Sequence, residues 1–134
     1  RHLLGKKHCV VITDGFYEWK KLDQKGKKKQ AYLIRVKGMR FTLMAGLWDT
    51  WVDKNTGELI NSCTIITRPA NKEMKFVHDR MPCLLSLDDA NVWVNQKLSL
   101  DERFAAFELL KDDFLEMKTV NKVGDIDEYK FLFD

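Results

Sequence analysis

The stretch LINSCTIIT, residues 59–67, carries the strongest β-strand signal in this chain of 134 residues. It is rich in Ile and Thr, whose β-branched side chains favour strands. Directly before it, residues 54–57 (KNTG) have the Asn and Gly of a hairpin turn. Further strand signals lie upstream, each bounded by turn residues, at 8–13, 16–21, 31–36 and 40–47 with its continuation 48–53. The first half of the chain is therefore predicted to be a series of short strands.

The sequence changes character after Pro69. Residues 70–76 (ANKEMKF) predict a short helix that this proline opens, because the first helical turn needs no backbone donor there. Residues 77–82 predict a loop. Two capping boxes follow, Ser86 with Asp89 and Ser99 with Glu102, and each predicts the start of a further helix, the second continuing over residues 103–111.

The order of these elements indicates the fold class. Strands come first, short helices follow, and residues 114–120 alternate in polarity and predict a returning strand. This order differs from an alternating βαβ series and favours the α+β class. We expect a single domain over residues 1–134, with a mainly antiparallel mixed β-sheet or open barrel and short helices packed at one side.

The composition suits an intracellular globular protein. Hydrophobic residues make up 45% of the chain, and the formal net charge of +3 is compatible with a nucleic-acid partner without requiring one. The three cysteines form no Cys-x-x-Cys pair, which predicts reduced thiols, a cytoplasmic location and neither metal site nor cofactor. No signal peptide and no apolar run of membrane-spanning length is visible, so we expect no membrane partner. We also expect a monomer.

Glu18 is the first candidate for chemistry. It lies in an aromatic run, GFYEW at 15–19, and strand alternation places it on the same face as Phe16. A carboxylate that aromatic rings shield from water is suited to acid–base catalysis. The alternative is an edge-strand glutamate that pairs with one of the many lysines.

His78 is the second candidate, because it stands in a predicted loop beside Asp79 and Arg80. Loops on a rigid scaffold often carry catalytic groups, and imidazole exchanges protons near neutral pH. Alternatively, the backbone or Asp79 satisfies His78 at a tight corner. Arg80 is suited to a bidentate phosphate contact, or else to an internal ion pair.

Lysines and cysteines give weaker signals. The cluster at residues 25–29 could follow a DNA backbone, although charge runs are more often simply solvated, which favours an ordinary hairpin tip. Cys9 and Cys63 lie among β-branched residues and are expected to be buried, whereas the surroundings of Cys83, after a proline, are less clear.

Three motifs together resemble the SOS-response-associated peptidase (SRAP) family. They are DGFYEW at 14–19, AGLW at 45–48, and a block of TIIT at 64–67, Ala70-Asn71 and HDRMP at 78–82. Their joint order and spacing are specific. The resemblance is strongest over residues 8–82, reaches Val120-Asn121, and implies an SRAP-like fold.

The resemblance also implies a chemistry on single-stranded DNA that contains an abasic site. In the family, autocatalytic removal of a leader exposes an N-terminal cysteine, whose amine and thiol form a Schiff base and then a thiazolidine crosslink with the abasic aldehyde. Glu18 matches the glutamate beside that amine, and His78 matches a histidine that promotes sugar ring opening and crosslink reversal. Thr67 matches a threonine near the abasic sugar, and Arg80 an arginine that contacts phosphate. If the source is bacterial, DNA binding also implies that this protein is associated with the nucleoid.

The family's N-terminal elements have no match in these residues. They are the nucleophilic cysteine, an Asn-Arg segment and a Trp-bearing loop, and Cys9 matches a core position instead. We therefore expect the chain to be an N-terminally truncated, C-terminal portion of an SRAP domain that forms no crosslink alone and leaves a sheet edge exposed. Two other functions stay open: a non-catalytic single-stranded nucleic-acid-binding module that uses the lysine cluster and Arg80, and a Cys/His peptidase that uses Cys83 and His78.

Overall fold

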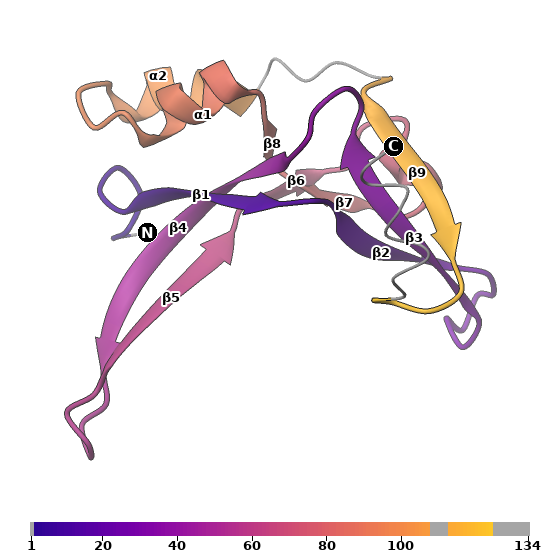
Figure 1. The fold of residues 1–134 in the computed structure, drawn as a ribbon, viewed down its shortest axis with the longest axis horizontal. Coiled ribbons are helices and arrows are strands. Elements are labelled where there is room, and N and C mark those ends of the chain that lie inside the picture. The colour runs from indigo at the N-terminus through magenta and orange to yellow at the C-terminus, as the bar shows by residue number, and fades with distance from the viewer. Residues whose placement is uncertain (1, 108–112, 125–134) are drawn as a thin grey trace. The chain divides into compact units, whose positions relative to one another are not determined.

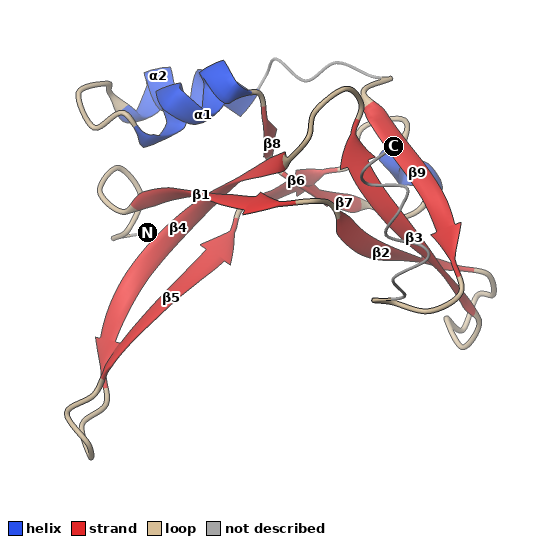
Figure 2. Ribbon diagram, viewed as in Figure 1, coloured by secondary structure: helices blue, strands red, loops and turns tan. Residues whose placement is uncertain are grey.

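The computed structural model describes residues 2–107 and 113–124, and strands predominate among them (Figures 1 and 2). The strands are β1 (His8–Thr13), β2 (Phe16–Lys21), β3 (Lys29–Val36), β4 (Thr42–Val52), β5 (Leu59–Ile65), β6 (Thr67–Pro69), β7 (Arg80–Pro82), β8 (Leu84–Leu85) and β9 (Leu115–Val120). The helices are α1 (Leu87–Val94) and α2 (Leu100–Phe104), with the short 3-10 helices η1 (Met74–Phe76) and η2 (Ala105–Phe107). Within this part of the chain, no helix is long and apolar enough to span a bilayer.

The chain folds into two compact units, each made of three segments. The first unit comprises residues 1–11, 43–67 and 82–110, and the second comprises residues 12–42, 68–81 and 111–134. Each unit therefore collects residues that are far apart in the sequence, and each has a sheet and a set of buried apolar side chains.

The sheet of the first unit has the strand order β1-β4-β5, and β8 also pairs with β4. β4 and β5 form a long antiparallel hairpin whose register runs from Gly46 opposite Ile65 to Val52 opposite Leu59. The backbone amide of Asp53 donates to the carbonyl of Glu58 (2.8 Å) and closes the turn. β5 lies at the sheet edge (Figure 1). All seven of its residues are exposed.

Trp93 of α1 is the centre of the first unit's core. Its side chain is fully buried, and its indole N–H is shared between the carbonyls of Cys9 (3.0 Å) and Gly46 (3.2 Å). The ring stacks on His8, with centroids 3.7 Å apart, and Phe104 and Phe107 pack at 5.9 and 4.9 Å. One aromatic side chain thus joins strands β1 and β4 to the helices.

The two predicted capping boxes start α1 and α2. The Ser86 hydroxyl accepts from the Asp89 amide, and the Ser99 hydroxyl accepts from the Glu102 amide, with both reciprocal carboxylate contacts formed. The second helix begins at Leu100, directly after the predicted cap Ser99, and continues as η2; residues 108–111 of the predicted helix lie outside the described part of the chain.

The sheet of the second unit has the order β2-β3-β9 and is antiparallel throughout. Leu33 and Val120 are buried on one face, with Tyr17 and Ala31 packed against them. Strand alternation places Ile34 and Val36 on the opposite face, where they are also buried. Both faces of this small sheet are thus partly covered.

The fold class predicted from the sequence is confirmed, in the form of open antiparallel sheets with short helices rather than a closed barrel. Two local predictions were wrong. The helix expected at 70–76 is reduced to the single 3-10 turn η1, and the loop expected at 77–82 ends in strand β7, which pairs with β6. The second error reflects the pairing of β7 with β6, which local propensity does not register.

Candidate functional site

Glu18 lies in the middle of β2, in the second unit, and is half-buried. It is directly opposite Tyr32 of β3, so these two side chains project from the same face of the sheet. Lys20 shares that face by alternation. One carboxylate oxygen of Glu18 accepts a hydrogen bond from the Trp19 amide (3.0 Å), which fixes the carboxylate close to the strand.

Residues 70–79 form a closed loop that carries His78 in the same unit. The Ala70 amide donates to the Asp79 carbonyl (2.9 Å) and ties the two ends of the loop together. Inside the loop, the Asn71 side-chain oxygen accepts from the Met74 amide (2.9 Å), and the His78 amide donates to the Met74 carbonyl (2.9 Å). The Ala-Asn and His-Asp-Arg motifs are thus two ends of one hydrogen-bonded structure.

Glu73 fastens this loop to the beginning of β9. Its carboxylate accepts from the backbone amides of Phe114 (3.0 Å) and Leu115 (3.4 Å). Met74, the first residue of η1, and Val77, directly after it, are buried, so the loop is held by packing as well as by hydrogen bonds. His78 therefore stands on a well-supported segment although it lies outside regular secondary structure.

The imidazole of His78 is oriented by the residue two positions later. Its Nδ1 accepts a hydrogen bond from the Arg80 amide (3.0 Å) and lies 3.3 Å from the Arg80 carbonyl oxygen. Acceptance from an N–H requires a lone pair on Nδ1, so the neutral ring carries its proton on Nε2. Nε2 is thereby the atom that can exchange a proton with a bound molecule.

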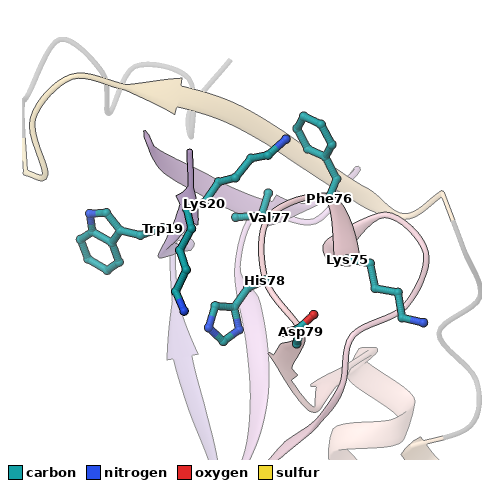
Figure 3. Close-up of a pocket in the computed structure, with 8 residues that line it drawn as sticks. Trp19, Lys20, Lys75, Phe76, Val77, His78 and Asp79 are labelled. Carbon is teal, nitrogen blue, oxygen red and sulfur yellow. The ribbon is translucent and has the colours of Figure 1, made fainter. Parts of the chain in front are cut away.

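His78 borders a hollow of about 240 Å³ in the second unit (Figure 3). The other side chains that border it come from β2 and from the loop, namely Trp19, Lys20, Lys21, Lys75, Phe76, Val77 and Asp79. Three ammonium groups and one carboxylate give it an excess of positive charge, which suits an anionic ligand such as a phosphate.

Phe76 forms an aromatic contact beside this hollow. Lys20 places its Nζ 3.1 Å from the centroid of the Phe76 ring, and Tyr32 meets the same ring edge to face at 6.1 Å. Phe76 nevertheless remains 59% exposed, and Trp19 is 42% exposed. Exposed aromatic rings beside cationic groups are typical of surfaces on which nucleobases stack.

The structure places the other two predicted residues as follows. Arg80 is exposed, begins β7 and belongs to the second unit, as do Glu18 and His78. Thr67 is exposed, begins β6 and ends the segment 43–67 of the first unit. Three of the four predicted site residues therefore share a unit.

The lysine cluster lies on the exposed tip of the β2–β3 hairpin, where the Lys28 carbonyl accepts from the Leu22 amide (2.9 Å).

The cysteines differ in their exposure. Cys83 is buried, and burial raises the pKa of the half-buried Cys9 thiol, with the nearby Cys63 adding to that shift. The expectation that Cys63 is buried was wrong, because Cys63 lies on the edge strand β5, all of whose residues are exposed. The burial of Cys83 argues against a thiolate nucleophile beside His78.

Among the described residues, no group of three His, Cys, Asp or Glu side chains is placed to hold a metal ion.

Sequence reasoning missed most of the residues that border the hollow. It singled out His78 but not Lys75 or Phe76, because charged and aromatic residues in a short predicted helix look like an ordinary solvated segment. Lys20 was missed as well, as one lysine among many in a predicted strand. The available signal was strand alternation, which places Lys20 on the face of Glu18.

Comparison with known proteins decides the family. The model of the SOS response associated peptidase (SRAP) family matches residues 1–125, which is nearly the whole chain. The chain belongs to the SRAP family. Among curated SRAP relatives, the abasic site processing protein YobE of Bacillus subtilis is 40% identical over 99 residues, which cover 72% of this chain and 43% of YobE. The abasic site processing protein HMCES of Xenopus tropicalis is 38% identical over 102 residues, which cover 66% of this chain and 30% of HMCES.

Solved structures show the same SRAP-like fold. A crystal structure of a protein from Bacteroides thetaiotaomicron superposes with a TM-score of 0.81 at 30% identity, and the match covers 91% of this chain and 53% of that one. A phage-related protein from Bordetella bronchiseptica gives a TM-score of 0.71 at 29% identity, covering 90% and 56%. The SRAP chain described here thus spans about two fifths of the Bacillus relative and about half of each solved structure.

Proposed function

We propose that the complete protein processes abasic sites in single-stranded DNA by forming a covalent crosslink to the abasic sugar, with Glu18 and His78 as acid–base groups and Arg80 and Thr67 as DNA contacts. The names of the curated relatives support the substrate class. In this proposal the nucleophile is an N-terminal cysteine that lies outside these 134 residues, and its exposure by autocatalytic removal of a leader accounts for the peptidase in the family name.

The proposed reaction requires several proton transfers. The abasic sugar must open to its aldehyde, and an amine must then add to the aldehyde carbon and expel water to give an imine. Addition of the thiol sulfur to the imine carbon, with transfer of the thiol proton to nitrogen, closes the thiazolidine ring. A carboxylate beside the amine serves as the base for its addition, and an imidazole serves the sugar oxygen during ring opening.

The observation that carries this proposal is the state of the His78 ring. The Arg80 amide occupies Nδ1, so Nε2–H remains to serve a ligand, and the ring borders a hollow with excess positive charge. A DNA phosphate suits that charge, and a base can stack on Trp19 or Phe76. Glu18 belongs to the same unit and shares a strand face with Lys20, which borders that hollow.

The test mixes the complete protein with an oligonucleotide that contains one abasic site. We expect a product that survives denaturing electrophoresis, and its formation by Glu18→Gln should be slower by about 10². Glu116→Gln is the matched control: this residue is on the same three-stranded sheet, is half-exposed, and bonds Arg35 instead. If intact protein gives no resistant product, or if both variants slow it equally, the proposal is wrong.

A further inference from the structure

The β4–β5 hairpin of the first unit exposes large apolar side chains on both of its faces. Register and alternation place Trp48, Val52, Leu59 and Ile65 on one face and the cross-strand pair Trp51 and Ile60 on the other. Their exposed fractions range from 40% for Ile65 to 65% for Leu59. Scattered apolar residues on a surface are ordinary, whereas six on one hairpin mark a surface that binds protein.

The free edge of this hairpin lacks the features that protect edge strands. Edge strands usually carry charges, prolines or bulges that prevent pairing with another strand. β5 reads LINSCTI and contains neither a charged residue nor a proline, and its pairing with β4 runs without interruption over seven residue pairs. Among the described residues, no strand pairs with the outer edge of β5, so this edge can accept an additional strand.

The first face also contains a hollow of about 420 Å³. It is bordered by side chains and backbone of β1, β4 and β5, among them Cys9, Val11, Trp48 and Cys63. An apolar side chain from a covering layer would fit this recess.

We propose that the remainder of the SRAP domain, outside these 134 residues, docks on this hairpin, adds a strand to the free edge of β5 and covers both faces. A second copy of the chain is the less suitable occupant, because a twofold contact uses one self-complementary patch, whereas here two opposite faces need cover. The matched relative is more than twice as long as the region it shares with this chain, so enough polypeptide is available. This inference rests on membership of the family and not on the proposed DNA chemistry.

Neighbouring residues of β5 provide a probe for each face. Cys63 pairs with Trp48 on the first face, and Ser62 pairs with Asp49 on the second. In the complete protein, maleimide labelling of Cys63, and of Ser62→Cys in a Cys63→Ser background, should each be at least about 100-fold slower under native conditions than after unfolding. Lys25→Cys, on the exposed β2–β3 hairpin tip, should label rapidly and serves as the control.

Three results would overturn this proposal. Labelling of Cys63 as fast as that of the residue-25 thiol would show that the first face is uncovered, and fast labelling at position 62 alone would show the same for the second face. Protection that disappears on dilution, together with dissociation of a dimer, would assign the surface to a second copy. Slow labelling of both thiols at all concentrations, with β5 amides protected from hydrogen exchange, is the expected result.

Discussion

The backbone amide of Arg80 donates a 3.0 Å hydrogen bond to Nδ1 of His78, so the residue proposed to contact phosphate also fixes the tautomer of the proposed proton carrier. The side chain of Arg80 is not needed for this effect, because only its main chain is involved. Substitutions at the two positions should consequently separate DNA affinity from proton transfer.

His78→Asn should retain the loop and lose the chemistry. The asparagine side-chain oxygen can accept from the Arg80 amide in place of Nδ1, but the residue has no group that exchanges protons near pH 7. We expect formation or reversal of the crosslink to slow by about 10²–10⁴, with stability changed by less than about 0.5 kcal/mol. The crosslinking rate of the complete protein measures the first effect, and its urea unfolding measures the change in stability. His2→Asn, at an 83% exposed side chain, is the control, and an unchanged rate in His78→Asn would contradict the assignment.

Glu73→Gln should loosen the loop that carries His78. The wild-type carboxylate accepts from the Phe114 and Leu115 amides, and hydrogen bonds to charged groups contribute about 1.5–3 kcal/mol. We expect a loss of about 1–2 kcal/mol in the free energy of unfolding, measured by urea titration. Glu58→Gln, in the exposed turn of the β4–β5 hairpin, serves as the control. Equal stabilities of the two variants would show that the Glu73 contacts are not significant.

Stability should fall with acid because of His8. Its Nε2 accepts from the Gly5 amide (2.9 Å), so the neutral ring carries its proton on Nδ1, 2.8 Å from the Trp93 carbonyl. Burial, and then the Arg103 guanidinium, lower the pKa of His8, although the Trp93 carbonyl opposes this shift. The folded state therefore binds the proton less readily than the unfolded state.

The stabilising contribution of neutral His8 is thus complete above the ordinary histidine pKa of 6.5 and is lost as the pH falls through the lowered folded-state value. Urea midpoints measured between pH 8 and pH 4.5 should show this decline. His8→Phe retains a stacked ring but cannot titrate, so the midpoint should depend less on pH. A decline of the same size in His8→Phe would assign the effect to carboxylates instead.

Gly46→Ala should destabilise the first unit. A Cβ at this position would lie 2.9 Å from the Cys9 sulfur and 3.0 Å from the Thr64 carbonyl oxygen, and both distances are too short. We expect a cost of about 1–3 kcal/mol. Cys9→Ala in the same chain should restore part of it, because the sulfur contact disappears while the backbone contact remains. A double-mutant cycle by urea unfolding measures this coupling, and strict additivity would contradict it.

Much of the fold is predictable because local chemistry and tertiary structure agree in it. The capping boxes at Ser86 and Ser99 act within four residues, so the sequence predicts both helix starts. The aromatic content of residues 16–21 likewise predicts β2, and alternation predicts β9. By contrast, β7 forms because Arg80–Pro82 pairs with β6, and Cys63 is exposed because no described layer covers β5. Both features depend on which segments of the chain contact each other in the folded protein, and the local sequence around each residue does not determine these contacts.

The candidate site is only partly predictable for the same reason. Glu18 stands out as a carboxylate within an aromatic run and His78 as a histidine in a polar loop, and both occur in the second unit. The role of Arg80 as the hydrogen-bond donor to His78 resides in its main chain, which side-chain chemistry does not reveal. The cation–π contact of Lys20 with Phe76 joins residues that are 56 positions apart and becomes visible only in three dimensions.

The burial of Trp93 gives the protein an internal optical reporter. Trp19, Trp48 and Trp51 are each more than 40% exposed, whereas Trp93 is 0% exposed. A collisional quencher such as acrylamide will therefore quench the fluorescence of the three exposed tryptophans first, so that the remaining emission comes from Trp93. Because that ring bonds β1 and β4 and touches both helical segments, the residual fluorescence follows the integrity of one unit alone, without any introduced label.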